Sequence, residues 1–168
     1  MTQPTGPTPH AWRAGNLSYG AALTLGTVKK MLESGEKEAE KLGVPMVIAI
    51  ADAGGNLLAV HRMDDVMLGS TEIAMDKAYM AVTGKRATGH WKKEFQAGTL
   101  LTSFIHQRWV VLGGGYIIEK DGLILGGIGV SGGTIEDHYV ARAALEAGGF
   151  STSEVDSYIA DMGRSVKQ

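Results

Sequence analysis

The stretch MVIAIADAGGNLLAVHRMD, residues 46–64, decides the fold of this chain. Two apolar runs of strand length, residues 46–51 and 57–62, flank the letters DAGG, which favour a turn. The first run is apolar throughout, and this is typical of a central strand buried on both faces. The stretch therefore predicts two antiparallel strands that bring Arg62 and Asp64 to a strand end.

A second stretch, GGIGVSGGTIEDHYVA at residues 126–141, combines the end of a strand, a glycine loop and the start of a helix. Just upstream, the strand-like runs 116–119 and 123–130 are joined by an Asp-Gly pair, which is a strong hairpin signal. We expect this stretch and the first one to place their strand ends near each other in one antiparallel sheet.

Helical periodicity surrounds these strands. Apolar residues recur at helical steps over residues 18–41, 70–83 and 88–96, and further helices are predicted over 134–145 and from 151 onward. Ser70, Thr134 and Ser151 are the expected capping residues. Because strand–helix–strand units do not repeat, a parallel doubly wound sheet is disfavoured. The predicted class is α+β, with helices flanking an antiparallel sheet.

Composition limits the classes of function. Of the 168 residues, 44% are hydrophobic and 20% are charged, and the formal net charge of −2 gives no electrostatic case for binding nucleic acid or an anionic membrane. The absence of cysteine excludes disulfides, thiol catalysis and thiolate metal sites. No segment approaches the roughly 20 apolar residues of a membrane span.

The first fifteen residues carry three of the four prolines and no apolar run. They are not a signal peptide. We therefore expect a cytoplasmic protein with a flexible N-terminal arm over residues 1–15 and a single domain over residues 16–168.

Three features are candidates for chemistry. Arg62 at a strand end offers a bidentate fork to a planar carboxylate, unless it only forms an ion pair with Asp64 or Glu72. Lys77 lies among alanines on a predicted helix, so its amine is either ion-paired or tuned for chemistry. His138 lies near a helix start, where a lowered pKa would make it a neutral base or donor.

The glycine loop at residues 131–134 opens a helix, so free backbone N–H groups and the helix dipole favour an anion there. The loop is neither a P-loop nor the dinucleotide-binding fingerprint, because the residues that follow do not match. Tight packing of helix on sheet is the alternative reason for its glycines.

Together these segments resemble the GlcG/HbpS-like family, once called haem-degrading. The resemblance spans about residues 15–148 and rests on IADAGGNLLAVHRMDD, AMDKAYMA, GGGYII, LGGIGVSGG and EDHYVARAAL. It implies a profilin-like α+β domain, with about five antiparallel strands, helices on both faces and assembly as a homo-oligomer. It also implies haem as a cofactor in some members, for redox sensing or haem breakdown, while others belong to catabolic operons.

Carried over residue by residue, the resemblance implies a pocket that combines charged side chains with glycine loops: Arg62, Asp64, Lys77, Gly114, Gly115, Gly132, Gly133 and Asp137. Two departures stand out. Related haem-binding domains look as if they use a histidine on the first helix as the iron ligand. Residues 16–43 of this chain contain no histidine. The family's proline is also missing from the segment GGYII at residues 114–118.

Two functions remain open. The first is a haem- or small-ligand-binding protein. The second is a catabolic enzyme, an isomerase, hydratase or decarboxylase, acting on a small oxo or hydroxy acid or an aromatic breakdown product. In the enzyme, Arg62 would hold the carboxylate, the amides of Gly132 and Gly133 would stabilise negative charge, and His138 or Asp64 would move a proton, with Lys77 as a further catalytic candidate. A metal is not specified by the sequence.

Apolar residues in excess of what one subunit is expected to bury predict a homo-oligomer. They are Met67 and Leu68, the stripe of the first helix, and a stripe on the last helix made of Val155, Tyr158, Ile159 and Met162.

Overall fold

The computed structural model describes residues 18–19, 22–98 and 107–165. The predicted N-terminal arm at residues 1–15 lies outside this part, so its boundary with the domain stays a prediction. His10 and His106 also lie outside it.

After one short strand and one helix, the order of two strands followed by two helices occurs twice. In chain order they are β1 (Ser18–Tyr19), α1 (Leu25–Leu42), β2 (Val47–Asp52), β3 (Leu57–Arg62), α2 (Ser70–Thr83), α3 (Thr88–Gln96), β4 (Gly115–Lys120), β5 (Leu123–Ser131), α4 (Glu136–Gly148) and α5 (Ser153–Ser165). The first helix thus begins at Leu25 and not at Ser18, where the short strand β1 lies instead.

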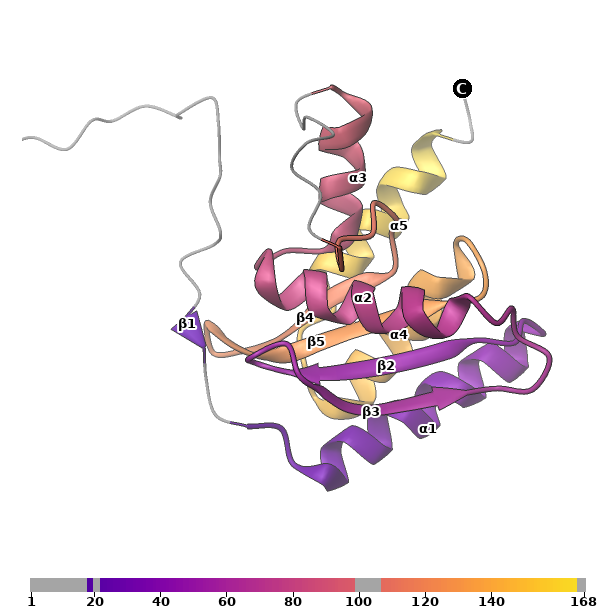
Figure 1. The fold of residues 1–168 in the computed structure, drawn as a ribbon. Helices are drawn as coiled ribbons and strands as arrows, with labels where there is room; N and C mark the ends of the chain where they lie inside the picture. Colours follow the sequence, from indigo (N-terminus) through magenta and orange to yellow (C-terminus); the bar gives the residue numbers. More distant parts are fainter. Residues whose placement is uncertain (1–17, 20–21, 99–106, 166–168) are drawn as a thin grey trace, which may run out of the picture.

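The sheet confirms the predicted α+β architecture. Four strands run antiparallel in the order β4-β5-β2-β3, and the two residues of β1 pair parallel with the start of β5. Helix α2 covers one face, and α1 and α4 cover the other (Figure 1). Val47 of β2 lies opposite both Arg62 of β3 and Ser131 of β5. The predicted ends of β3 and β5 therefore lie at the same end of the sheet, with β2 between them.

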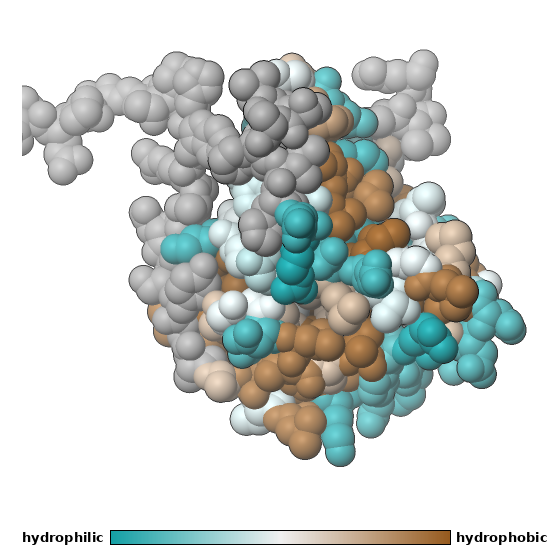
Figure 2. All heavy atoms as spheres, in the orientation of Figure 1, coloured by the Kyte–Doolittle hydropathy of each residue, from teal (hydrophilic) through white to brown (hydrophobic). Residues whose placement is uncertain are grey.

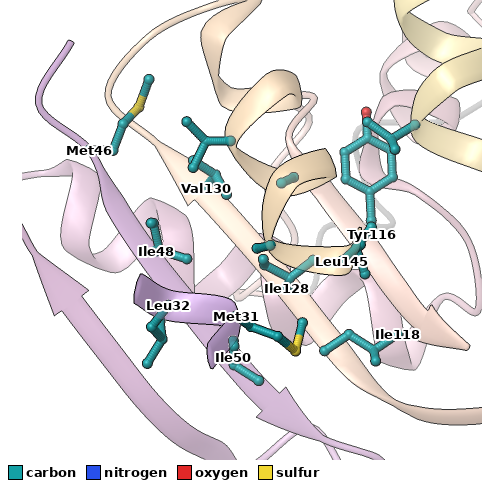
Figure 3. Close-up of a cluster of buried hydrophobic side chains, with 14 of the residues drawn as sticks. Met31, Leu32, Met46, Ile48, Ile50, Tyr116, Ile118, Ile128, Val130 and Leu145 are labelled. Atoms are coloured by element: carbon teal, nitrogen blue, oxygen red, sulfur yellow. The ribbon is translucent and has the colours of Figure 1, made fainter. Parts of the chain in front are cut away.

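The main core lies between the sheet and helices α1 and α4. Ile48 and Ile50 of β2 and Ile128 of β5 are fully buried there against Met31 of α1 (Figure 3). The first apolar run of the sequence is thus a central strand, because its other face, with Val47, packs under α2. Burial of this kind stabilises by roughly 1.5–3 kcal/mol for each large apolar side chain.

Glycines in β4 and β5 let α2 lie directly on the sheet. A Cβ atom on Gly129 would overlap the carbonyl oxygen of Ala74, and one on Gly115 would lie 2.6 Å from the carbonyl oxygen of Lys77. Only a residue without a side chain permits so close an approach of helix and strand. The consequence is that the side chain of Lys77 reaches the end of β5.

Two of the three predicted helix caps are wrong. No side chain caps α2, and α4 begins two residues after Thr134, whose hydroxyl donates to Glu136. The last helix begins at Ser153, whose N–H donates to the hydroxyl of Ser151 at 3.4 Å, while Glu154, the other half of the predicted capping box, accepts a hydrogen bond from the backbone of Ala87. Polar side chains near these helix starts therefore serve tertiary contacts or the loop itself.

The stripe of the last helix does not support association. Val155 and Tyr158 are buried and Ile159 packs against the main core, so this stripe is satisfied within one subunit. The stripe of α1 is buried or half-buried against the core from Val28 onward. Of the described residues that the sequence indicated as surplus, Leu25 at the start of α1 and Met67 and Leu68 before α2 are exposed, at 65%, 65% and 80%.

Among the helices of the described ranges, none combines the length and the apolar character needed to cross a bilayer.

Candidate functional site

A cavity of about 210 Å³ opens beside the end of β5. Its walls come from the loop before α2, from α2 and α3, from the segment before β4, from the glycine loop, and from α4 and α5. The lining residues are Met67, Ile73, Lys77, Lys92, Leu112, Gly113, Ser131, Gly132, Gly133, Thr134, Asp137, His138, Tyr158 and Met162. Residues far apart in sequence therefore converge here, including five of those that the sequence singled out.

Lys77 and Asp137 form a buried ion pair in the cavity wall. The Nζ atom of Lys77 lies 2.7 Å from Oδ2 of Asp137 and donates a second hydrogen bond, also 2.7 Å, to the carbonyl oxygen of Val130. The two side chains are almost fully buried. Burial lowers the pKa of Lys77 and raises the pKa of Asp137, and the attraction between the two groups opposes both shifts. The pair links α2, β5 and α4.

Backbone N–H groups of the glycine loop donate to carboxylate side chains at the start of α4. The N–H of Gly133 donates to Oδ1 of Asp137 at 2.8 Å, and the N–H of Thr134 donates to Oε2 of Glu136 at 2.9 Å. These are orphan donors at a helix start, which carboxylates commonly satisfy. The amide of Gly133 is therefore not free to hold a ligand's negative charge, contrary to the role predicted from the sequence.

His138 is buried and neutral. Its Nδ1 atom lies 2.5 Å from the hydroxyl oxygen of Tyr116, and the ring of Tyr158 stacks on it at a centroid distance of 4.6 Å. Burial lowers the pKa of His138 to about 4, with smaller contributions from the charges of Lys77 and Lys92. The lowered pKa agrees with the prediction, but desolvation is its main cause and the helix start is not.

Lys92 is the cavity residue that sequence reasoning missed. It lies half-buried on α3, lines the cavity, and has no ion-pair partner among the described residues. The charge of Lys77 is balanced by Asp137, so Lys92 leaves the cavity with an unbalanced positive charge. The sequence does not distinguish Lys92 from the adjacent Lys93, because two consecutive lysines on a short helix are typical of a solvent-exposed face.

The structure separates Arg62 and Asp64 from the cavity. Both side chains are exposed on the far side of β2, neither lines the cavity, and neither forms an ion pair with another described residue. Gly114 and Gly115 lie behind the cavity: a Cβ on Gly114 would lie 3.0 Å from Nζ of Lys77, and the N–H of Gly115 donates to Thr88. The roles of all these residues stay predictions.

Within residues 18–19, 22–98 and 107–165, no group of three or more acidic or histidine side chains is placed to hold a metal ion.

A sheet with helices on both faces and a cavity with polar and apolar walls at the strand ends is typical of small α+β domains that bind ligands. The particular family follows from comparison: residues 23–146 match the family described as "Haem degrading protein HbpS-like". The chain belongs to this family.

Three relatives place the chain more closely. It is 38% identical over 130 residues to the "Uncharacterized 15.0 kDa protein in dhaT-dhaS intergenic region" of Citrobacter freundii, covering 75% of this chain and 92% of that protein. It is 38% identical over 102 residues to "Protein GlcG" of Escherichia coli K12, covering 60% and 75%. The crystal structure of the PduOC:heme complex superposes with a TM-score of 0.74 at 34% identity, covering 79% of this chain and 99% of that one.

Proposed function

We propose that this chain is a haem-binding protein. The observation that carries the proposal is its likeness, in fold and at 34% identity, to a protein whose crystal structure is that of a haem complex. Membership of the HbpS-like family supports the same conclusion. Family likeness alone does not say where haem would lie, so the residues of this chain must be tested for their fit.

The cavity does not fit haem as an enclosed ligand. Pockets that enclose ligands of drug size have volumes of about 300–1,000 Å³, whereas this cavity has about 210 Å³. A macrocycle could place at most one of its edges inside.

The edge strand β3 fits haem better. Its residues Leu57 and Leu58 are exposed, and apolar side chains gather on the face of the molecule that carries β3 and α2 (Figure 2). His61 of this strand has its Nδ1 atom 2.6 Å from Glu36, an orientation that leaves Nε2 for iron. His61 pairs with Ile48 on the α1 side of the sheet, whereas Arg62 pairs with Val47 on the α2 side, because successive side chains of a strand point to opposite faces. Haem held by both would therefore have to lie around the outer edge of β3, with a propionate on the guanidinium of Arg62. When bound, haem would supply redox chemistry centred on iron.

A haem titration followed by the Soret band tests the proposal. We expect a shifted Soret band at micromolar haem for the wild-type protein, and an altered band for His61→Ala. His90→Ala is the matched control, because His90 is also half-exposed and also lies near a glutamate, Glu154. No shift in the wild type would refute haem binding. An unaltered band in His61→Ala would leave haem binding intact and refute the assignment to β3.

We further propose that bound haem serves either its own degradation or redox sensing. Incubation of the haem complex with ascorbate and oxygen separates these uses. Loss of the Soret band with release of iron supports degradation. A spectral change that is reversed by reoxidation supports sensing.

A second candidate function is favoured by the cavity itself, whose size suits a small molecule. We propose a catabolic enzyme that isomerises, hydrates or decarboxylates a small oxo or hydroxy acid, with neutral His138 polarising the substrate oxygen and the Lys77–Asp137 pair holding the wall. His138→Gln, which keeps an N–H donor but has no imidazole to accept and return a proton, should lower kcat. Turnover unaffected by this change would remove His138 from the mechanism.

We also propose that the protein is a cytoplasmic homo-oligomer. Met67 and Leu68 are exposed beside the cavity, and patches of this kind are commonly covered by association.

A further inference from the structure

We infer that the cavity binds the carboxylate of a small acid between the Nε2–H group of His138 and the ammonium group of Lys92, and that Tyr116 is the positioning residue that fixes this tautomer of His138. The inference rests on the second candidate function and names the substrate group and its two partners. It replaces Arg62, the partner expected from the sequence, with a residue on α3.

The tautomer follows from the hydrogen bonding of Tyr116. This side chain is 1% exposed, and burial raises its pKa, so the phenol keeps its proton. In the described part of the chain its hydroxyl has one hydrogen-bond partner, Nδ1 of His138. A buried hydroxyl without another acceptor donates to the one within reach. Nδ1 is then the acceptor, and the proton of the neutral imidazole is on Nε2.

The Nε2 edge of the ring lies next to Gly113, which is one of the residues that line the cavity. A Cβ atom on Gly113 would lie 2.8 Å from Cε1 and 3.1 Å from Nε2 of His138, and 3.2 Å from the hydroxyl oxygen of Tyr158. Gly113, His138 and Tyr158 all line the cavity. The ring therefore presents a donor to the ligand, and an Nε2 atom that carries a proton has no lone pair for iron.

The charge balance selects an anion. Lys77 is neutralised by Asp137, and Asp137 has both oxygens occupied, by Lys77 and by the N–H of Gly133. Glu136 accepts from Thr134 and does not line the cavity. Among the described residues that line the cavity, Lys92 thus remains as the positive charge without a counterion. Its charge already acts on His138, because it contributes to lowering the pKa of that ring.

The remaining part of the cavity wall favours a ligand whose carboxylate is attached to an apolar group. Ile73, Leu112 and Met162 also line the cavity and give its wall an apolar part. A carboxylate with a short aliphatic or single-ring body therefore matches both the volume and the chemistry, and benzoate is a suitable probe. Benzamide has the same shape without the charge.

The tautomer is tested without any ligand. Long-range proton–nitrogen NMR spectra of protein labelled with ¹⁵N-histidine should show His138 with a protonated Nε2 and an unprotonated Nδ1. In Tyr116→Phe, the Nδ1 resonance should move because its donor is gone, while circular dichroism reports whether the fold is kept. A proton on Nδ1 in the wild type overturns the inference.

Ligand selection is tested by titrating benzoate, pyruvate and acetate, with benzamide as the neutral comparison. We expect benzoate to shift the Nε2–H resonance of His138, and Lys92→Met to weaken benzoate by about tenfold or more, as for the loss of a charge-assisted hydrogen bond. Benzamide should bind the wild type and Lys92→Met equally. Lys120→Met, at the exposed end of β4, removes the same charge outside the cavity and should leave benzoate binding unchanged.

The outcomes separate this inference from the proposed functions. If none of the three acids shifts His138 at tens of millimolar, or if Lys92→Met binds benzoate as the wild type does, carboxylate recognition here is refuted. Haem binding to β3 would stand in either case, because it uses neither residue. If benzoate binds but no acid is turned over, the proposed enzymatic function is refuted and the proposed carboxylate site is supported.

Discussion

Replacing His138 by glutamine should remove a specific part of the pH dependence of stability. The folded protein holds this ring neutral, since burial lowers the pKa of His138 to about 4, whereas the unfolded chain protonates it near the ordinary value of about 6.5. Between these two values the unfolded state binds more protons than the folded state. Stability is therefore retained above about pH 6.5 and is lost as the pH falls through this window.

The magnitude follows from the two pKa values. At pH 5.5, one unit below the ordinary value, protonation stabilises the unfolded state by about 1.4 kcal/mol, while the folded ring is still neutral. At pH 7.5 the same effect is below about 0.1 kcal/mol. Because His138 is 3% exposed, little of this difference is screened by solvent. The wild type should lose about 1.4 kcal/mol between the two values of pH through this residue.

Urea unfolding at pH 7.5 and 5.5 measures the effect as a difference between two proteins. His138→Gln is less stable at both values, but its loss between them should be smaller than that of the wild type by about 1.4 kcal/mol. Other groups that titrate in this range contribute equally to both proteins and cancel. Val140→Ala, which truncates another buried side chain of α4 and removes no titratable group, is the control and should keep the loss. Equal losses in wild type and His138→Gln would refute a buried neutral ring.

Three further expectations follow from the packing. Lys77→Met leaves Asp137 buried without its counterion and should lower the free energy of unfolding by about 3–5 kcal/mol in urea. The double variant Lys77→Met/Asp137→Leu should recover much of this loss, and a single variant as stable as the wild type would contradict a buried pair. Gly129→Ala places a Cβ against the carbonyl oxygen of Ala74 and should cost about 1–3 kcal/mol, whereas Gly26→Ala, which has open space in α1, should not destabilise. Light scattering should report an oligomer that Met67→Glu weakens, and a 17.8 kDa species for the wild type would contradict this.

The sequence predicted the sheet well because its signals are local. The apolar run of β2, the DAGG turn and the Asp-Gly hairpin each act over a few residues, and β3, α2 and α3 lie at the predicted positions. The predicted capping box failed for a non-local reason. Glu154 has the spacing of a capping box, but its carboxylate accepts a hydrogen bond from the backbone N–H of Ala87, which is distant in sequence.

The site was only partly predictable for the same reason. Lys77, Asp137 and His138 were noticed because each is polar within an apolar pattern or lies at a helix start. Lys92 carries no such signal, and its place in the cavity depends on how α3 packs beyond α2. Arg62 was placed correctly in the sheet, since it lies level with Ser131 across Val47. Sharing an edge does not ensure sharing a cavity, because β2 lies between the two strand ends.

That shared edge nevertheless connects the two proposed ligands. Arg62 and Ser131 are two strand spacings apart, roughly 10 Å, with β2 between them. A haem propionate is itself a carboxylate, so haem that is not confined to β3 would be able to occupy the same site beside Lys92. In that arrangement benzoate competes with haem, and Lys92→Met weakens both. If haem stays on β3 alone, saturating benzoate leaves the Soret titration unchanged, and the cavity then serves a ligand of its own.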